Sequence, residues 1–157
     1  MTRQPERREE TVTVFMCSRE SKAMTETHSP EPGDTHTCQR TFTHEDVERF
    51  GEISGDQQAI HTDPDEDGRL VVQGLLTATL STKIGGDLEV LATRMEFNYR
   101  RPVYTGQTIT CVWKNESVTE RDDRYELFVT LSCTNDDGVE VLSGETEGII
   151  WKDDPGE

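Results

Sequence analysis

The pattern of apolar and polar residues changes its period near Leu88. Before that point the apolar residues recur at helical spacing, and after it they alternate with polar residues at a period of two. Alternation of this kind is typical of strands that bury one face in a core. We therefore expect an α+β chain, with helices in the first half and an antiparallel run of strands in the second.

Two helices are expected in the first half. Thr43 occupies the position of a helix N-cap, and the acidic residues Glu45 and Asp46 in the first turn suit the helix dipole. Ser54-Gly55 is expected to end this helix. The second helix, about residues 74–84, is the most apolar stretch and mixes small with large residues, so we expect it to be buried. The apolar stripe of the first helix is Val47, Phe50 and Ile53.

Five strands are expected, one before the first helix and four after the second. The four later strands are joined by short polar turns, of which Asn-Asp-Asp-Gly at residues 135–138 has the composition of a hairpin. Short turns make consecutive strands antiparallel, so the sheet should curl around the helix at residues 74–84. The expected strands are residues 35–42, 91–99, 108–118, 125–134 and 139–151.

The first 33 residues show no periodicity, so we expect a tail at residues 1–33 followed by a single domain at residues 34–153. Residues 1–23 contain five basic and four acidic residues, whereas the remainder is strongly acidic. With Met16 and Met24 as alternative starts, this break in composition fits a segment foreign to the native product. It fits a genuine disordered arm equally well.

Charge limits the partners of this chain. The formal net charge is −16, from 32 acidic and 16 basic residues. Such a surface repels nucleic acids and anionic membranes, so we expect neither as a partner. It suits a cytosol with molar salt, and we therefore expect a halophilic source. No apolar run reaches the roughly 20 residues of a membrane span and no signal-peptide core is present, which predicts a cytoplasmic protein.

Neither the cysteines nor the acidic loop predicts a metal site. The four cysteines lack zinc-site spacing, and Cys111 and Cys133 lie in strand patterns that predict buried thiols. Asp63, Asp65 and Asp67 imitate the start of a calcium loop. However, Gly74 occupies the position where that loop requires a bidentate glutamate, so we predict a solvated acidic loop.

The candidate chemistry lies in residues 54–61, Ser-Gly-Asp-Gln-Gln-Ala-Ile-His. Asp56 and His61 are five residues apart in a segment that we expect to form a turn between the two helices. A carboxylate beside an imidazole suits a base that takes a proton from water or substrate and later returns it. The spacing alone is a weak signal, because a loop histidine is often structural.

Several segments resemble, in order, the MaoC-like (R)-specific enoyl-CoA hydratases. Residues 43–56 resemble the helix that leads into the active site of that family. Asp56 and His61 resemble its Asp-x-Asn-Pro-aliphatic-His motif, although Gln58-Ala59 replaces Asn-Pro. The start of the second helix, Gln73-Gly-Leu-Leu, is similar to the family's His-Gly-Met-Leu. Residues 97–106 are similar to its strand and Arg-Pro-Val turn.

The resemblance implies a hot-dog fold, in which an antiparallel sheet wraps around one helix, and a homodimer or higher homo-oligomer. It implies Asp56 and His61 as catalytic residues that activate one water. The backbone N–H of Gly74 would stabilise the thioester oxygen, and Gln58 and Leu75 would contact the substrate. The implied substrate is an acyl-CoA thioester, and no further cofactor is implied.

The expected reaction is therefore the interconversion of trans-2-enoyl-CoA and (R)-3-hydroxyacyl-CoA. Two alternatives remain open. One is a hot-dog acyl-CoA thioesterase, since the same fold also supports thioester hydrolysis. The other is a non-catalytic acyl-CoA-binding subunit, which the departures at Gln58-Ala59 and Gln73 favour.

The acidic surface generates a prediction about salt. At molar ionic strength the screening length falls to about 3 Å, so repulsion between the carboxylates is largely removed. We expect the melting temperature of the protein to rise from low to multimolar KCl. Greater stability at low salt would contradict a halophilic source.

Overall fold

The computed structural model describes residues 29–153, in the element order β-α-α-α-β-β-β-β. Of the tail that we expect at residues 1–33, residues 1–28 lie outside the described residues. Each predicted strand is present within a few residues of its expected bounds, and one short helix was not predicted. The elements are β1 (Thr35–Thr41), α1 (His44–Ser54), α2 (Ala59–Thr62), α3 (Gly74–Asp87), β2 (Leu91–Tyr99), β3 (Thr108–Glu120), β4 (Arg124–Thr134) and β5 (Glu140–Trp151).

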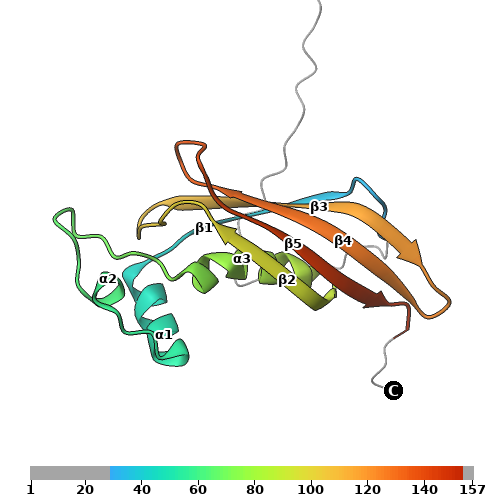
Figure 1. The fold of residues 1–157 in the computed structure, drawn as a ribbon, viewed down its shortest axis with the longest axis horizontal. Coiled ribbons are helices and arrows are strands. Elements are labelled where there is room, and N and C mark those ends of the chain that lie inside the picture. The colour runs from blue at the N-terminus through green and yellow to red at the C-terminus, as the bar shows by residue number, and fades with distance from the viewer. Residues whose placement is uncertain (1–28, 154–157) are drawn as a thin grey trace, which may run out of the picture.

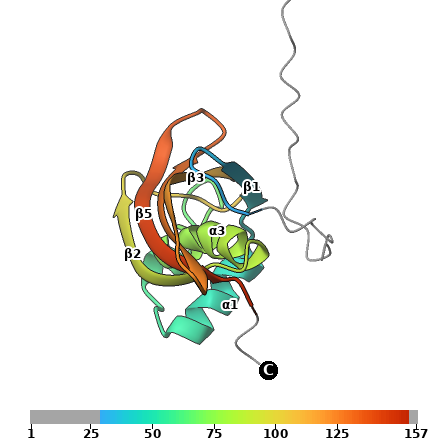
Figure 2. The ribbon, with the colours of Figure 1, turned by 90° about the vertical axis from the view of Figure 1, so that its right-hand side faces the viewer.

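The five strands form one antiparallel sheet in the order β1-β3-β4-β5-β2. The sheet extends over α3, and α1 and α2 lie together beyond one end of that helix (Figure 1). Seen along the sheet, the strands curl around α3 (Figure 2). The expected antiparallel sheet wrapped around a central helix is therefore confirmed.

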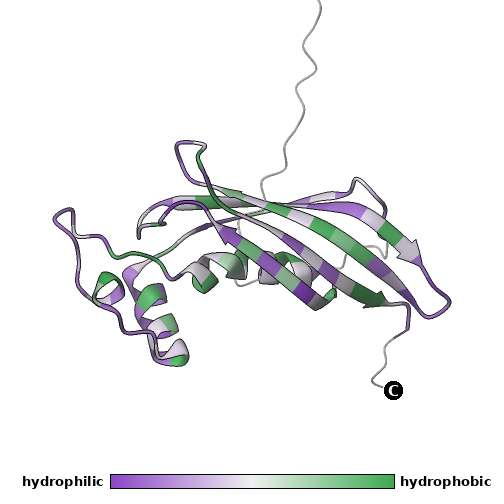
Figure 3. Ribbon diagram, viewed as in Figure 1, coloured by the Kyte–Doolittle hydropathy of each residue, from purple (hydrophilic) through white to green (hydrophobic). Residues whose placement is uncertain are grey.

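The core lies between α3 and the concave face of the sheet. Along β4, Leu127, Val129 and Leu131 are buried, and their neighbours in the strand face the other way, as the alternation predicts. The apolar residues continue through the middle of the strands and α3, whereas the turns are polar (Figure 3). Trp113 is also buried, and its indole N–H donates to Asn115 Oδ1 at 2.9 Å.

Three cysteines form a row across the core. Cys38 pairs in register with Cys111, which in turn pairs with Cys133, and all three are buried thiols. The contact with Cys133 and burial raise the pKa of Cys111, so this thiol stays protonated. The prediction of buried thiols at Cys111 and Cys133 is confirmed, and Cys17 lies outside the described residues.

Helix α1 begins and ends where the sequence predicts. Thr43 forms a capping box with Asp46: the Asp46 N–H donates to Thr43 Oγ1, and the Thr43 N–H donates to the Asp46 carboxylate. Gly55 ends the helix at a φ of 77°, a left-handed conformation that favours glycine. Only the stripe differs from expectation. Val47 is buried but Ile53 is 84% exposed, because α1 extends past the sheet and nothing covers its last turn.

Residues 29–33, which the sequence places in the tail, contact the strands. Gly33 N–H donates to Asn115 O at 2.7 Å, and the Tyr125 hydroxyl bonds to Ser29 Oγ at 3.2 Å. The described chain therefore joins the domain a few residues before β1. Among residues 29–153, no helix has the length and apolar content needed to cross a bilayer.

Candidate functional site

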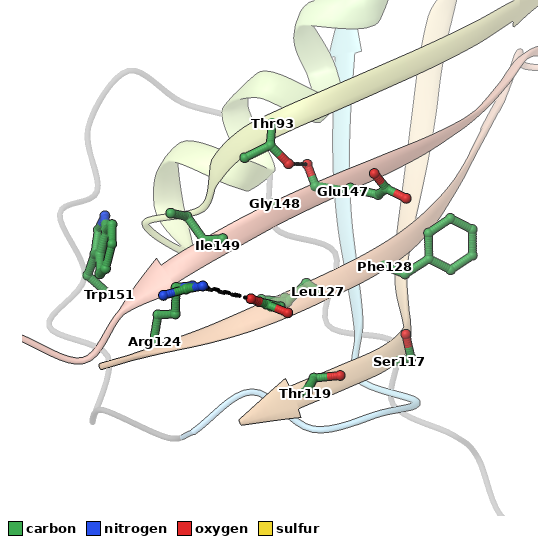
Figure 4. Close-up of a pocket in the computed structure, with 11 residues that line it drawn as sticks. Thr93, Ser117, Thr119, Arg124, Leu127, Phe128, Glu147, Gly148, Ile149 and Trp151 are labelled. Carbon is green, nitrogen blue, oxygen red and sulfur yellow. Dashed lines mark hydrogen bonds and ion pairs between the residues drawn. The ribbon is translucent and has the colours of Figure 1, made fainter. Parts of the chain in front are cut away.

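Two hollows mark the surface, and the larger holds none of the predicted site residues. It has a volume of about 540 Å³ and lies over β4 and β5, lined among others by Phe128, Ile149 and Trp151 (Figure 4). Its one ion pair joins Arg124 to Glu126 at 3.0 Å. Hydrogen bonds from Arg121, and then from Arg124, lower the pKa of Glu126, so this carboxylate is a poor proton acceptor.

The smaller hollow, of about 220 Å³, brings together the two predicted catalytic residues, Asp56 and His61, whereas Gln58, Gly74 and Leu75 do not line it. It is enclosed by α1, by the loop after α1 and by the residue before α3. Asp56, His61 and Gln73 all line it, although they come from three separate stretches of the chain. This hollow is the candidate active site.

A short helix, α2, holds the histidine. Gln58 is the N-cap of α2, and Ala59 is its first residue. The first position of a helix needs no backbone donor and readily accepts proline. Alanine therefore preserves the local conformation where the MaoC-like motif has proline. The sequence predicts a turn here, because four residues are too few to show helical periodicity.

His61 is held by a backbone carbonyl. Its ring is buried, and Nδ1 lies 2.6 Å from Val71 O. A carbonyl oxygen can only accept, so Nδ1 carries the proton and donates it. In the neutral ring Nε2 is then unprotonated, and it faces Asp56 Oδ2 at 3.4 Å. Two hydrogen-bond acceptors therefore face each other across the site.

Gln58 holds the carboxylate of Asp56. Its side-chain amide donates to Asp56 Oδ1 at 3.0 Å, and its backbone N–H donates to the same oxygen at 3.4 Å. The side-chain bond from Gln58 is the main reason why the pKa of Asp56 lies below its usual value, and the backbone N–H of Gln58 contributes less. Gln58 thus leaves Oδ2 free to face His61.

The N-terminus of α3 lies beside this pair. Val71, whose carbonyl binds His61, stands three residues before Gly74, the first residue of α3. Within the described chain, the first turn of α3 has no acidic residue and no side-chain cap. Its free N–H groups and the helix dipole therefore favour an anion there. Leu75 follows and is 61% exposed.

No family model matches the sequence. Over 129 residues the chain is 26% identical to a mitochondrial 3-hydroxyacyl-[acyl-carrier-protein] dehydratase of Arabidopsis thaliana, covering 75% of this chain and 76% of the relative. The unliganded R-hydratase PhaJ1 of Pseudomonas aeruginosa superposes with a TM-score of 0.68 at 18% identity, covering 78% of this chain and 82% of that one. A MaoC-like dehydratase from Rhodospirillum rubrum gives a TM-score of 0.65 at 15% identity, covering 79% and 94%.

The chain has the hot-dog fold of the MaoC-like hydratases and dehydratases. The resemblance and the fold expected from the sequence are confirmed. Asp56, His61 and Gln58 lie together in this hot-dog domain, and Gly74 and Leu75 begin the helix next to them.

The structure gives a packing reason for glycine at position 74. The space of a Cβ is filled by the Tyr99 ring, whose Cε1 would lie only 2.7 Å away. A larger residue would displace this ring, whereas glycine lets it lie against the start of α3. The role of the Gly74 N–H toward a substrate is a separate question.

Two further residues position the site, and the sequence gives little signal of either. Gln73 is only 3% exposed, and its amide nitrogen donates to Val47 O at 3.0 Å, which joins α1 to the start of α3. Gly51 lies under the site loop, where a Cβ would stand 3.3 Å from Asp56 O. From sequence, Gln73 is a departure from the family pattern and Gly51 a weak point in a helix.

The Gln58 contact generates a prediction about Asp56. Replacing Gln58 with methionine removes the side-chain donor, so the pKa of Asp56 should rise toward the ordinary value of 3.8. Because the folded pKa is depressed, this carboxylate stabilises the fold above pH 3.8, and that stabilisation is lost as the pH falls through the folded pKa. Carbon-13 NMR titration of the Asp56 carboxyl measures the shift. Gln57→Met is the matched control, and an equal change in both variants would contradict the assignment.

Proposed function

We propose that the chain is a hydratase/dehydratase that interconverts trans-2-enoyl-CoA and (R)-3-hydroxyacyl-CoA. The observation that carries this proposal is the facing pair of acceptors. Asp56 Oδ2 and the unprotonated Nε2 of His61 lie 3.4 Å apart beside the first turn of α3. Such a pair is complementary to a group with two hydrogens to donate, and water is the smallest such group.

In this proposal one water donates one hydrogen bond to Asp56 and one to His61. Its oxygen lone pair is then directed at C3 of the enoyl thioester. As the C3–O bond forms, the pair takes a proton from the water, and it returns a proton to C2 to complete the addition. The reverse sequence is dehydration. The Nδ1–H···O bond from His61 to Val71 keeps Nε2 available as the accepting atom throughout.

The negative charge that develops during addition falls on the thioester oxygen. The N–H of Gly74, at the N-terminus of α3, is the donor that we assign to that oxygen. A preorganised donor of this kind stabilises the transition state by about 3 kcal/mol. Leu75, exposed in the same turn, is the apolar residue that we assign to the acyl chain.

A cation without an ion-pair partner supports an anionic carrier such as CoA. Arg101 is the one arginine or lysine among residues 29–153 that no carboxylate contacts at ion-pair distance. It stands two residues before Val103, whose carbonyl accepts the N–H of Val72 at 2.7 Å. This bond joins the segment that follows Arg101 to the residues that precede α3. The Arabidopsis relative is named for an acyl-carrier-protein thioester, so the assay compares both carriers.

The test is a pair of substitutions assayed with crotonyl-CoA. Asp56→Asn and His61→Gln each replace a group that can take a proton from the proposed water with an amide that cannot, so each should lower the hydration rate by a factor of about 10² to 10⁴ while the variants stay folded. Loss of enoyl absorbance reports hydration, and circular dichroism reports folding. Asp63→Asn and His44→Gln, both exposed residues outside the hollow, are the controls.

Three outcomes separate the proposal from its alternatives. Near-wild-type turnover in Asp56→Asn or His61→Gln would contradict the assigned roles. Release of free CoA thiol without hydration of the double bond would indicate a thioesterase. Binding of crotonyl-CoA with neither reaction would indicate a non-catalytic subunit. A lower KM for crotonyl-acyl-carrier-protein than for crotonyl-CoA would contradict CoA as the carrier of the acyl group and leave the proposed reaction unchanged.

We further propose that the active form is a homodimer or a higher homo-oligomer, joined through β2. This strand is an edge of the sheet, and all its residues except the half-buried Phe97 are exposed. Met95 pairs with Thr146, which is buried on the α3 side, so Met95 points to that side yet is 40% exposed. An uncovered apolar edge strand is suited to pair with a second copy of itself.

The dimer generates its own prediction. Light scattering after gel filtration in multimolar KCl should give at least twice the chain mass of 17.8 kDa. Met95→Arg places a charge in the proposed interface and should shift the protein toward the monomer. Val112→Arg is the matched control, since Val112 is an exposed apolar strand residue of β3. A monomeric wild-type protein, or equal dissociation of both variants, would contradict an interface at β2.

A further inference from the structure

The residue that covers Gly74 has chemistry that its packing role does not use. Tyr99 is the last residue of β2, and its ring lies against the first residue of α3. The ring carbon that bears the hydroxyl, Cζ, is 3.0 Å from the point where a Cβ of Gly74 would stand. The hydroxyl oxygen is one covalent bond further. The hydroxyl is therefore carried by a ring that packs against the first residue of α3.

The hydroxyl is free to donate. Tyr99 is 52% exposed, and its hydroxyl makes no hydrogen bond to any of residues 29–153. Partial burial raises the pKa of Tyr99, so the phenol is protonated at neutral pH. Packing against Gly74 accounts for an aromatic ring at position 99, but the ring of a phenylalanine would fill the same space. This packing therefore does not account for the hydroxyl of Tyr99.

The backbone fixes where this hydroxyl stands. Tyr99 pairs in register with Leu142 of β5, and the next residue, Arg100, donates its N–H to Val141 O at 2.8 Å. The ring is then confined between β2 and the start of α3. Because the strand and the helix are both held by backbone bonds, the range of positions open to the phenol is restricted, which a donor needs in order to lower a reaction barrier.

We propose that the Tyr99 hydroxyl donates a hydrogen bond to the thioester carbonyl oxygen, as a second donor beside the Gly74 N–H. This inference rests on the proposed hydratase function and adds a catalytic residue to it. When water adds to C3, the π electrons of the C2=C3 bond move onto the thioester oxygen to form an enolate. They return when C2 takes up the proton that the Asp56–His61 pair removed from water. The two donors hold the charge between these steps.

The first experiment is Tyr99→Phe, which keeps the ring against Gly74 and removes only the hydroxyl. We expect kcat for crotonyl-CoA hydration to fall by a factor of about 10 to 100, somewhat less than for a fully buried oxyanion donor. KM should change much less, because the bond strengthens as charge develops. Tyr125→Phe is the control, since its hydroxyl bonds to Ser29 outside the hollow.

The second experiment reads the hydrogen bond directly. Infrared spectroscopy of crotonyl-CoA labelled with carbon-13 at the carbonyl is recorded on Asp56→Asn protein, which binds without turnover. We expect Tyr99→Phe in that background to move the carbonyl stretch to higher frequency, because a lost donor leaves the C=O bond less polarised. Tyr125→Phe should leave the band in place.

The outcomes separate the proposed role of Tyr99 from the proposed hydratase function. A normal kcat in Tyr99→Phe together with an unmoved carbonyl band would overturn the role of Tyr99 and leave the hydratase intact. A lowered kcat with a shifted band supports it. If wild-type protein hydrates no enoyl thioester, the proposed function fails, and the band then still reports whether Tyr99 contacts a bound thioester.

Discussion

The candidate site depends on one hydrogen bond, from His61 Nδ1 to the carbonyl oxygen of Val71. It fixes the imidazole tautomer, because the carbonyl can only accept. It also joins the loop that carries Asp56 to the segment that begins α3. Without this bond, Nε2 of His61 could carry the proton and donate an ordinary hydrogen bond to Asp56. With it, two acceptors are left facing each other, and a third molecule must supply the hydrogens.

Several contacts around this bond hold it in place. The N–H of Val71 donates to Ile60 O at 2.9 Å, so the two segments are joined in both directions. Gln73 bonds to Val47 and connects α1 to the same segment. Gly51 allows the backbone of Asp56 to lie against α1. The site is therefore built from short-range contacts between α1, α2 and the start of α3, and the sheet supports it from behind.

Most of the fold could be predicted from sequence, because its signals are local. Alternation along residues 125–133 marks a strand with one buried face, and the Thr43 cap marks the start of α1. The motif also placed Asp56 and His61 as a pair. What sequence could not give depends on contacts between distant segments. The exposure of Ile53, the Tyr99 ring over Gly74 and the Gln73–Val47 bond follow only from how the elements meet.

The decisive measurement is the position of the ring proton of His61, read by nitrogen-15 NMR of the labelled imidazole at alkaline pH. The account predicts that the proton of the neutral ring resides on Nδ1, with Nε2 showing the shift of an unprotonated nitrogen. A neutral ring protonated at Nε2 would contradict it. Asp56 and His61 would then bond to each other directly, and His61 would have no lone pair for a water.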